Sequence, residues 1–443
     1  MSVPVLRARG TVRERDRPAH GIDVRASRVD AVRRSRPPLP AWPLLVLLHG
    51  FPLAWAAGAA PFVTVAMAGV MGVHLILHGQ VRLVPGLLPW FAFLAWLLVS
   101  GAVMTSPMQA VGFVQRAADL VAVGIVMLYY VNARTTLGVT QLLRGFFVVW
   151  TTLVVLGVLA ILFPEVRLTT PIGQIMPGAL VENELVRDLV SPRLAEVQQP
   201  WGAEEPYNRP AAPFPYANAW GMAYVLLTPL AVLTMRHARR RRSRVAIATL
   251  VGLSVWPALE TSNRGMLLGL AVYVGVLTVR SLAQGLGRHA LGLLAAAGIT
   301  GGVVLWSGAA EAMLGRQEVS NTTEGRESIY RATLDKVAES PIFGWATPEV
   351  DPTIGIALGT QGYAWTLLYC YGVVGLLLFA WFLLGSVLRT RTLTSPTGVA
   401  LHGLLVTTIV TVWFYGLGVT QLTVVCLVAA ALLRARHDEE ELA

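Results

Sequence analysis

The stretch Leu250–Tyr273, LVGLSVWPALETSNRGMLLGLAVY, decides how this chain folds. It contains one apolar run, a polar corner at Glu260–Gly265, and then a second apolar run. Helical runs of about 20 apolar residues cross the ~30 Å hydrocarbon core of a bilayer. An arginine between two such runs is costly to place, so Arg264 marks a candidate functional site between two membrane helices.

The composition of the whole chain places it in the same class. Of the 443 residues, 55% are hydrophobic and 14% are charged, and the mean hydropathy is +0.60. These values are too apolar for a soluble globular protein. Apolar runs of membrane length recur along nearly the whole chain. We therefore predict an all-α fold, a polytopic transmembrane helical protein.

About twelve spans are expected, and the charges between them indicate their orientation. Arginines cluster in short connections at 236–244, 280–288, 389–391 and 434–436. With twelve spans, these clusters and an Arg-rich tail fall on one side, which the positive-inside rule makes cytoplasmic. Both termini are then expected in the cytoplasm and the protein in the cell membrane. The expected spans are 41–58, 61–79, 86–103, 110–131, 140–163, 214–235, 245–260, 265–282, 290–308, 358–386, 398–415 and 418–434.

Two long polar segments then lie outside the cytoplasmic membrane. The helical spacing of apolar residues predicts a short amphipathic helix around 181–189 in the first and another at 324–340 in the second. In the latter, Glu327 and Arg331 form an i,i+4 pair of opposite charge. The predicted parts are a disordered cytoplasmic tail (1–40), N-terminal helices (41–163), a first extracytoplasmic loop (164–213), central helices (214–308), a second loop (309–357), C-terminal helices (358–434) and an acidic tail (435–443).

The net charge of +10 does not indicate a nucleic-acid partner, because the basic residues sit mostly at helix ends. His74 and His78 are four residues apart, the spacing at which two histidines on one helix face can bind a metal, but no third ligand is near them in the sequence. We expect no metal and no other cofactor, and membrane lipid but no nucleic acid as partner.

Four segments carry motifs with a possible chemical role. They are Arg209-Pro210 through Asn218, then Ser262-Asn263-Arg264-Gly265, then Gly325–Gly344 with its Ser340-Pro341, and finally Gly359–Leu376 with Gln361, Tyr363 and Gly372. In this order they resemble motifs of the O-antigen ligase and polymerase family of membrane glycosyltransferases, including its S-x-R-G signature. The first segment keeps the Arg-to-Asn spacing of the family's R-P-S-G-x-F-x-N-P-N box but lacks its Gly and its first Asn.

The resemblance implies an inverting, metal-independent glycosyltransferase of ligase or polymerase type. It implies transfer of glycan from a polyprenyl-diphosphate carrier to a saccharide, lipid or wall acceptor at the outer face of the cytoplasmic membrane. Guanidinium groups bind phosphate bidentately and stay protonated, which suits a diphosphate leaving group. The residues expected to bind the diphosphate are Arg209, Arg264, Arg326 and Arg331, and the residues expected to support the site are Asn218, Ser262, Asn263, Tyr363, Arg116 and Asp119.

Arg116 and Asp119 lie three residues apart in an apolar run. Two roles stay open for them: an ion pair that fixes helix packing, or part of a polar cavity.

Gln361 stands where the family usually has a histidine. A neutral amide orients an acceptor hydroxyl but takes no proton from it. Either another group is the base, with Glu260, Glu327 and Asp351 as candidates, or the reaction needs little proton transfer, or activity is lost. The alternatives to an enzyme are a polytopic transporter or flippase for a lipid-linked or anionic substrate, and a non-catalytic partner in the same pathway.

Overall fold

The computed structural model describes residues 37–104, 106–182, 184–198, 206–306, 308, 322–438 and 442. Most of the predicted tail 1–40, and residues 309–321 of the predicted second loop, lie outside the described residues. Within the described part, nine helices are long and apolar enough to cross a membrane. The prediction of an all-α, polytopic membrane protein is confirmed.

Most of these helices match the predicted spans closely. They are α4 (Ala60–His78), the continuous run η1 (Pro85–Leu87), α5 (Leu88–Ser100) and η2 (Gly101–Val103), then α6 (Pro107–Asn132), α7 (Val139–Leu162), α11 (Ala217–His237), α13 (Arg264–Ala283), α14 (Gly287–Trp306), α17 (Tyr363–Thr390) and α19 (Val419–Asp438).

Three predicted spans do not appear among these nine helices, because they are too short or too polar. The predicted count of twelve is therefore not reached among the described residues. The segment 41–58 is two short helices, α2 (Trp42–His49) and α3 (Phe51–Ala56), each with proline in its first turn. α18 (Pro396–Thr411) has only 16 residues. α12 (Arg241–Glu260) begins inside the basic cluster, so its first turn is strongly polar.

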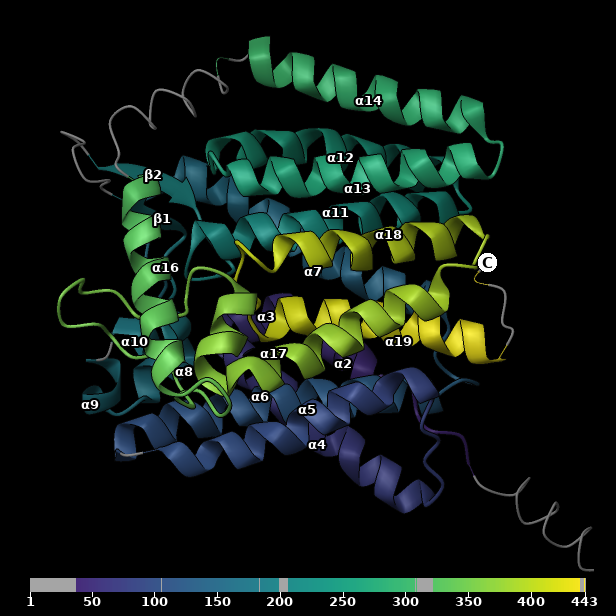
Figure 1. Cartoon of the computed structure of the whole chain (residues 1–443). Coiled ribbons are helices and arrows are strands. Elements are labelled where there is room, and N and C mark those ends of the chain that lie inside the picture. Colours follow the sequence, from purple (N-terminus) through teal and green to yellow (C-terminus); the bar gives the residue numbers. More distant parts are fainter. Residues whose placement is uncertain are drawn as a thin grey trace, which may run out of the picture. The chain divides into compact units, whose positions relative to one another are not determined.

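The helices pack side by side (Figure 1). The most buried of the nine is α19, in which 83% of the membrane-length apolar stretch lies inside the protein. α11 packs on α7, α19 on α6, α17 on α5, and α13 on α18. A helix that is apolar on all sides is expected in the interior, as α19 is. α14 is the opposite case, because it packs on α13 and buries only Ala290.

The predicted first loop is more ordered than its sequence suggests. It holds three short helices, α8 (Pro171–Ile175), α9 (Gly178–Val181) and α10 (Glu184–Val190), followed by β1 (Ala195–Gln198) and β2 (Tyr207–Pro210). The two strands pair antiparallel with Glu196 opposite Arg209. α10 corresponds to the helix predicted around 181–189, whereas the hairpin was not predicted, since four-residue strands carry too little alternation to be recognised.

The amphipathic helix predicted at 324–340 is present as α16 (Thr322–Glu339). One face of it is buried, since Ile329, Thr333 and Val337, spaced four residues apart, are 4%, 1% and 7% exposed. α16 packs on α17, so this polar helix covers the beginning of a membrane helix.

α17 is broken at Gly372, whose φ of +67° is in the left-handed region that favours glycine. The chain after α16 packs into the break. Trp345 and Ala346 donate their backbone N–H groups to the carbonyls of Tyr369 (2.9 Å) and Cys370 (2.8 Å), and Val373 donates to the carbonyl of Pro341 (2.8 Å). Such pairing satisfies backbone groups that a broken membrane helix leaves open.

Candidate functional site

The site lies at one end of the helices, where β1, β2 and α16 are found (Figure 1). Four pieces of chain meet there: the hairpin, the corner 260–265 between α12 and α13, the beginning of α17, and the turn 412–418 between α18 and α19. Three of them belong to the segments singled out in the sequence. The turn 412–418 does not.

Asn263 holds the corner together. Its side chain accepts from the N–H of Met266 (3.4 Å) and so caps the first turn of α13. The same oxygen accepts a hydrogen bond from the hydroxyl of Tyr415, and the amide nitrogen donates to Oδ1 of Asn218 on α11 (3.4 Å). One buried side chain therefore joins α13, α11 and the turn 412–418.

Close backbone approach explains the glycine of the Ser-Asn-Arg-Gly sequence. A Cβ placed on Gly265 would lie 2.9 Å from the hydroxyl oxygen of Tyr415. On the facing helix, a Cβ on Gly221 would lie 2.4 Å from Nδ2 of Asn263. The turn itself has Ser262 at a φ of +49°, a conformation that few non-glycine residues adopt. The corner is therefore tightly specified by its neighbours.

Arg209 supports the corner from the hairpin. It is only 7% exposed; its Nε donates to the carbonyl of Thr261 (2.8 Å) and its Nη1 to Oε1 of Gln198 (2.7 Å). Next to it on β1, Glu196 accepts from the N–H of Ala217 at the start of α11 (2.7 Å). The hairpin thus fixes both the corner and the beginning of α11.

Arg264 and Glu260 are exposed, whereas Thr261 and Asn263 between them are buried. Arg264 is the first residue of α13 and Glu260 the last residue of α12. The first turn of a helix carries a partial positive charge. Arg264 and the beginning of α13 therefore favour an anion at the same place.

The beginning of α17 is fixed to the same turn as the corner. The N–H groups of Tyr363 and Ala364 donate to the carbonyls of Tyr415 (2.8 Å) and Val412 (2.9 Å). A Cβ on Gly362 would lie 2.4 Å from the carbonyl oxygen of Trp413. Gln361, half-buried, directly precedes this contact. The turn 412–418 thus contacts both the first residues of α17, which follow Gln361, and Asn263, which precedes Arg264.

An aromatic cluster joins α16 to this assembly. The ring of Tyr330 stacks on that of Trp365 with centroids 4.7 Å apart, and Trp365 Nε1 donates to the carbonyl of Trp413 (3.1 Å). The Trp413 side chain is 50% exposed.

Lys336 on α16 donates to Glu339 (2.8 Å), and this hydrogen bond raises the pKa of the lysine.

Among the described residues, no hydrogen bond or ion pair joins the charged candidates of the second loop to the corner. Glu327 and Arg331 form the predicted i,i+4 ion pair (2.7 Å), but both are well exposed, and such pairs contribute little. Asp351 accepts from the N–H groups of Thr353 (2.8 Å) and Ile354 (3.1 Å), which makes it a turn-forming residue. The Arg326 side chain lies outside the description.

Arg116 and Asp119 lie on α6. Nη1 of Arg116 is 3.7 Å from Sγ of Cys370 on α17. Among the interactions of the described residues, none is an ion pair between Arg116 and Asp119, and none joins either residue to the corner. Both residues are half-buried.

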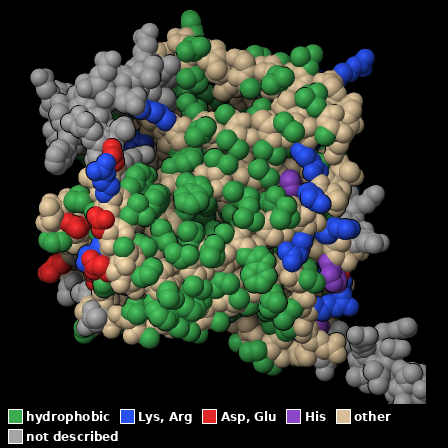
Figure 2. All heavy atoms as spheres, in the orientation of Figure 1, with side chains coloured by type: hydrophobic (Ala, Val, Ile, Leu, Met, Phe, Trp, Pro, Cys, Tyr) green, Lys and Arg blue, Asp and Glu red, His purple; other side chains and the backbone are tan. Residues whose placement is uncertain are grey.

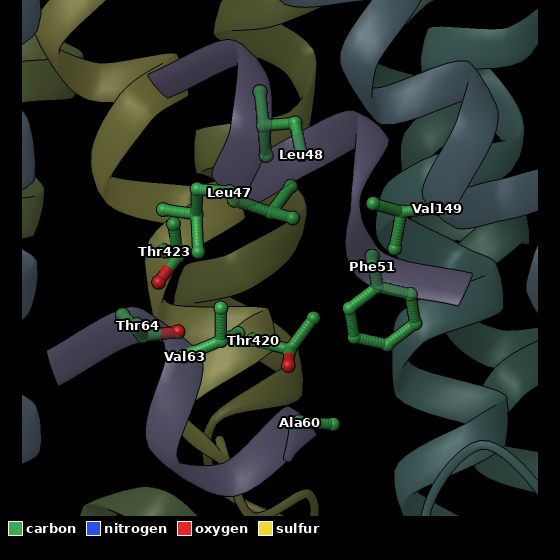
Figure 3. A pocket seen from close by; sticks show the side chains of 10 residues that line it. Leu47, Leu48, Phe51, Ala60, Val63, Thr64, Val149, Thr420 and Thr423 are labelled. Atoms are coloured by element: carbon green, nitrogen blue, oxygen red, sulfur yellow. The ribbon is translucent and has the colours of Figure 1, made fainter. Parts of the chain in front are cut away.

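A small hollow elsewhere among the helices is too small for a sugar. It lies between α2, α3, α4, α7 and α19 (Figure 3) and has a volume of about 20 Å³. Its lining is apolar except for Thr64, Thr420 and Thr423. Space of this size holds about one water molecule. In the part of the chain that the structure describes, no group of three His, Cys, Asp or Glu is arranged to hold a metal ion.

Charge divides the two ends of the helices (Figure 2). Carboxylates, with some Lys and Arg among them, gather at the end that carries α16, and mainly Lys, Arg and His gather at the opposite end. The basic end includes the connection from α11 to α12 with Arg239–Arg242, and Arg280 and Arg391 near the ends of α13 and α17.

Sequence reasoning missed Tyr415 and Gln198, which support the corner, and Glu196, which holds the beginning of α11. No motif marks these residues, since they act through hydrogen bonds that only the fold brings together. The search of protein-family models gave no match to this chain, and no curated protein matches it either.

Proposed function

We propose that this protein is a membrane glycosyltransferase of O-antigen ligase or polymerase type. The observation that carries the proposal is that the hairpin with Arg209, the corner with Arg264, and Gln361 at the beginning of α17 are all tied, directly or through Tyr415 and Asn263, into one assembly. These segments resemble the family's motifs in sequence, and their meeting in space is what a shared site requires.

In the proposed reaction, an acceptor hydroxyl oxygen attacks the anomeric carbon of the carrier-linked glycan. The bond from that carbon to the diphosphate oxygen breaks, and polyprenyl diphosphate leaves with the electron pair. Arg264 and the beginning of α13 stabilise the negative charge that develops on the leaving group. Gln361 orients the hydroxyl, whose proton passes to a carboxylate or to water.

The supporting roles follow from the contacts. Arg209, buried and bonded to Thr261 and Gln198, positions the corner in this proposal. Glu260 is exposed beside Arg264, so it is the favoured carboxylate among the three candidates. The Glu327–Arg331 pair on α16 would meet the glycan at the edge of the site.

The proposed orientation places the site on the outer face, with twelve spans completed by α2–α3, α12 and α18. We expect a cysteine at exposed Thr353 to react with an impermeant thiol reagent from outside intact cells and one at exposed Ser243 not to react, since basic connections stay in the cytoplasm. The native Cys370 and Cys426 are buried and give little background. Labelling of Ser243→Cys from outside, with Thr353→Cys silent, would move the site to the cytoplasm.

The size of the rate loss on removing the Gln361 side chain tests whether it orients the acceptor or acts as a base. If it only orients the acceptor, Gln361→Ala loses one hydrogen bond of ~0.5–1.5 kcal/mol and slows transfer by roughly 2- to 13-fold. Gln361→His is expected to keep or raise the rate, since it introduces a proton acceptor. The measurement is initial rate in reconstituted membranes at equal protein level.

A general base contributes on the order of 10²–10⁴-fold. A thousand-fold loss in Gln361→Ala would therefore contradict the orienting role. The matched control is Gln141→Ala, a half-buried glutamine in the first turn of α7 whose contacts are all local.

The second candidate is a transporter or flippase, and the break in α17 favours it, because discontinuous membrane helices often form transport sites. Against it, the open backbone groups at Gly372 pair with residues 341–346. The deciding experiment supplies purified protein in liposomes with a polyprenyl-diphosphate-linked oligosaccharide and an acceptor. Glycan transfer with release of carrier diphosphate supports the enzyme; movement of intact carrier-linked glycan across the bilayer, without transfer, supports the transporter.

A further inference from the structure

The basic end of the protein has a hollow that the proposed reaction does not use. It has a volume of about 420 Å³ and lies between the last turn of α11 and the first turns of α12. Met235 and Arg236 line it from α11, and Arg244, Val245 and Ala248 line it from α12. Two guanidinium groups therefore face the same space as three apolar side chains.

Arg244 is held in position at this hollow. Its Nε donates to the carbonyl oxygen of Ala238 in the connection between the helices (2.8 Å), which leaves the two terminal nitrogens for another acceptor. Arg236 is exposed in the last turn of α11. Guanidinium groups arranged in this way bind a phosphate oxygen pair with defined geometry.

The positive charge here has little compensation nearby. Arg239–Arg242 add four exposed guanidinium groups within the same connection. Neither α11 nor α12 contains an acidic residue apart from Glu260, which is at the far end of α12. An anion bound in the hollow is therefore attracted by six arginines and meets no carboxylate on these two helices.

The apolar part of the hollow continues along the outside of α12. From Val245 and Ala248 an exposed strip passes through Gly252 and Leu253 to Trp256. Spacings of three, four and seven residues place these positions on one face of the helix. A ligand with an anionic head and a hydrocarbon chain matches both parts at once, whereas a free phosphate matches only the arginines.

We propose that this hollow, the α11–α12 groove, binds the head group of an anionic phospholipid, with an acyl chain along the exposed strip of α12. Basic pockets between membrane helices on the cytoplasmic side are typical places for such head groups. The inference does not depend on glycan transfer, and it assigns the groove a role in anchoring the connection between α11 and α12.

Native mass spectrometry of the purified full-length protein, titrated with phosphatidylglycerol in detergent, tests the groove. We expect one phosphatidylglycerol to bind more tightly than phosphatidylcholine. Arg236→Gln together with Arg244→Gln is expected to weaken that binding by roughly 10- to 30-fold, as the loss of two arginines at an anionic lipid suggests. Ala248→Phe, which keeps every charge and narrows the hollow, is expected to weaken it as well.

The matched control is the double variant Arg239→Gln with Arg240→Gln. It removes the same charge from the same connection, but neither residue lines the groove. An equal loss of affinity in this control would show diffuse attraction and would overturn the proposal. Equal binding of phosphatidylcholine would overturn it too, and so would release of the lipid by millimolar inorganic phosphate, since the groove would then recognise phosphate alone.

Discussion

Arg264→Lys is expected to lower glycan transfer by on the order of 10²-fold while leaving membrane insertion and protein level unchanged, because it removes one preorganised donor from a developing negative charge. Lysine keeps the positive charge but not the planar pair of N–H donors that binds a diphosphate bidentately. Arg264 is exposed at the first residue of α13, so the smaller side chain leaves no buried gap. The measurement is initial transfer rate in liposomes.

The control is Arg389→Lys, the same exchange at an exposed arginine in the last turn of α17, at the basic end. It is expected to retain the wild-type rate. A normal rate in Arg264→Lys would remove Arg264 from the diphosphate site. A low rate accompanied by loss of folded protein would instead give Arg264 a structural role, which size-exclusion chromatography of both variants distinguishes.

Hydropathy was sufficient to find the membrane helices, because burial in lipid requires long apolar runs whatever the tertiary contacts. The stripe of Ile329, Thr333 and Val337 was also readable, since a helix half covered by protein keeps a period near 3.6 residues. The count of twelve was less secure. A glycine-proline pair at Gly50 and Pro52 divides the first expected span, and composition averages over such a break.

The candidate site could be predicted only in part. The polar corner between two apolar runs led to Arg264 and its neighbour Asn263, because such residues are costly to place in a membrane protein. The resemblance to a family motif led to Arg209. Sequence patterns did not lead to Tyr415, which lies 152 residues from Asn263 and meets it only through the fold. Nor did they distinguish the buried Arg209, bonded to Thr261 and Gln198, from the exposed Arg264. Burial is set by which loops pack together, and that is not a local property of the sequence.

The role of the stretch around Pro341 and Gly344 also could not be predicted from the sequence alone. Its resemblance to a family motif indicates a catalytic role. Its backbone pairs with the break in α17, and the ring of Phe343 stacks on that of Trp96 on α5 with centroids 5.3 Å apart. A Cβ on Gly344, whose φ is +70°, would lie 2.5 Å from the carbonyl oxygen of Tyr369. These residues therefore hold the first part of α17, with Gln361 before it, against the rest of the protein.

Gly372→Ala is accordingly expected to destabilise the protein strongly. The added Cβ would lie 2.0 Å from the carbonyl oxygen of Ile342, a backbone atom that has little room to move. The φ of +67° adds a cost of about 1–2 kcal/mol for a residue with a side chain. We expect a total loss of about 3 kcal/mol or more. The measurement is thermal unfolding of the detergent-solubilised protein, followed by the monomer peak in size-exclusion chromatography.

Gly275→Ala is the matched control, since it is the same exchange inside the membrane helix α13, where a new Cβ meets no atom within 4 Å. Removing a helical glycine is expected to leave stability unchanged or raise it by about 0.5–1 kcal/mol. If both variants unfold at the wild-type temperature, the break in α17 and its pairing with residues 341–346 are wrong. If only Gly372→Ala unfolds at a lower temperature, the residues around Pro341 have a structural role at the break in α17. The proposed chemistry then depends on Gln361 and on the exposed corner residues Arg264 and Glu260.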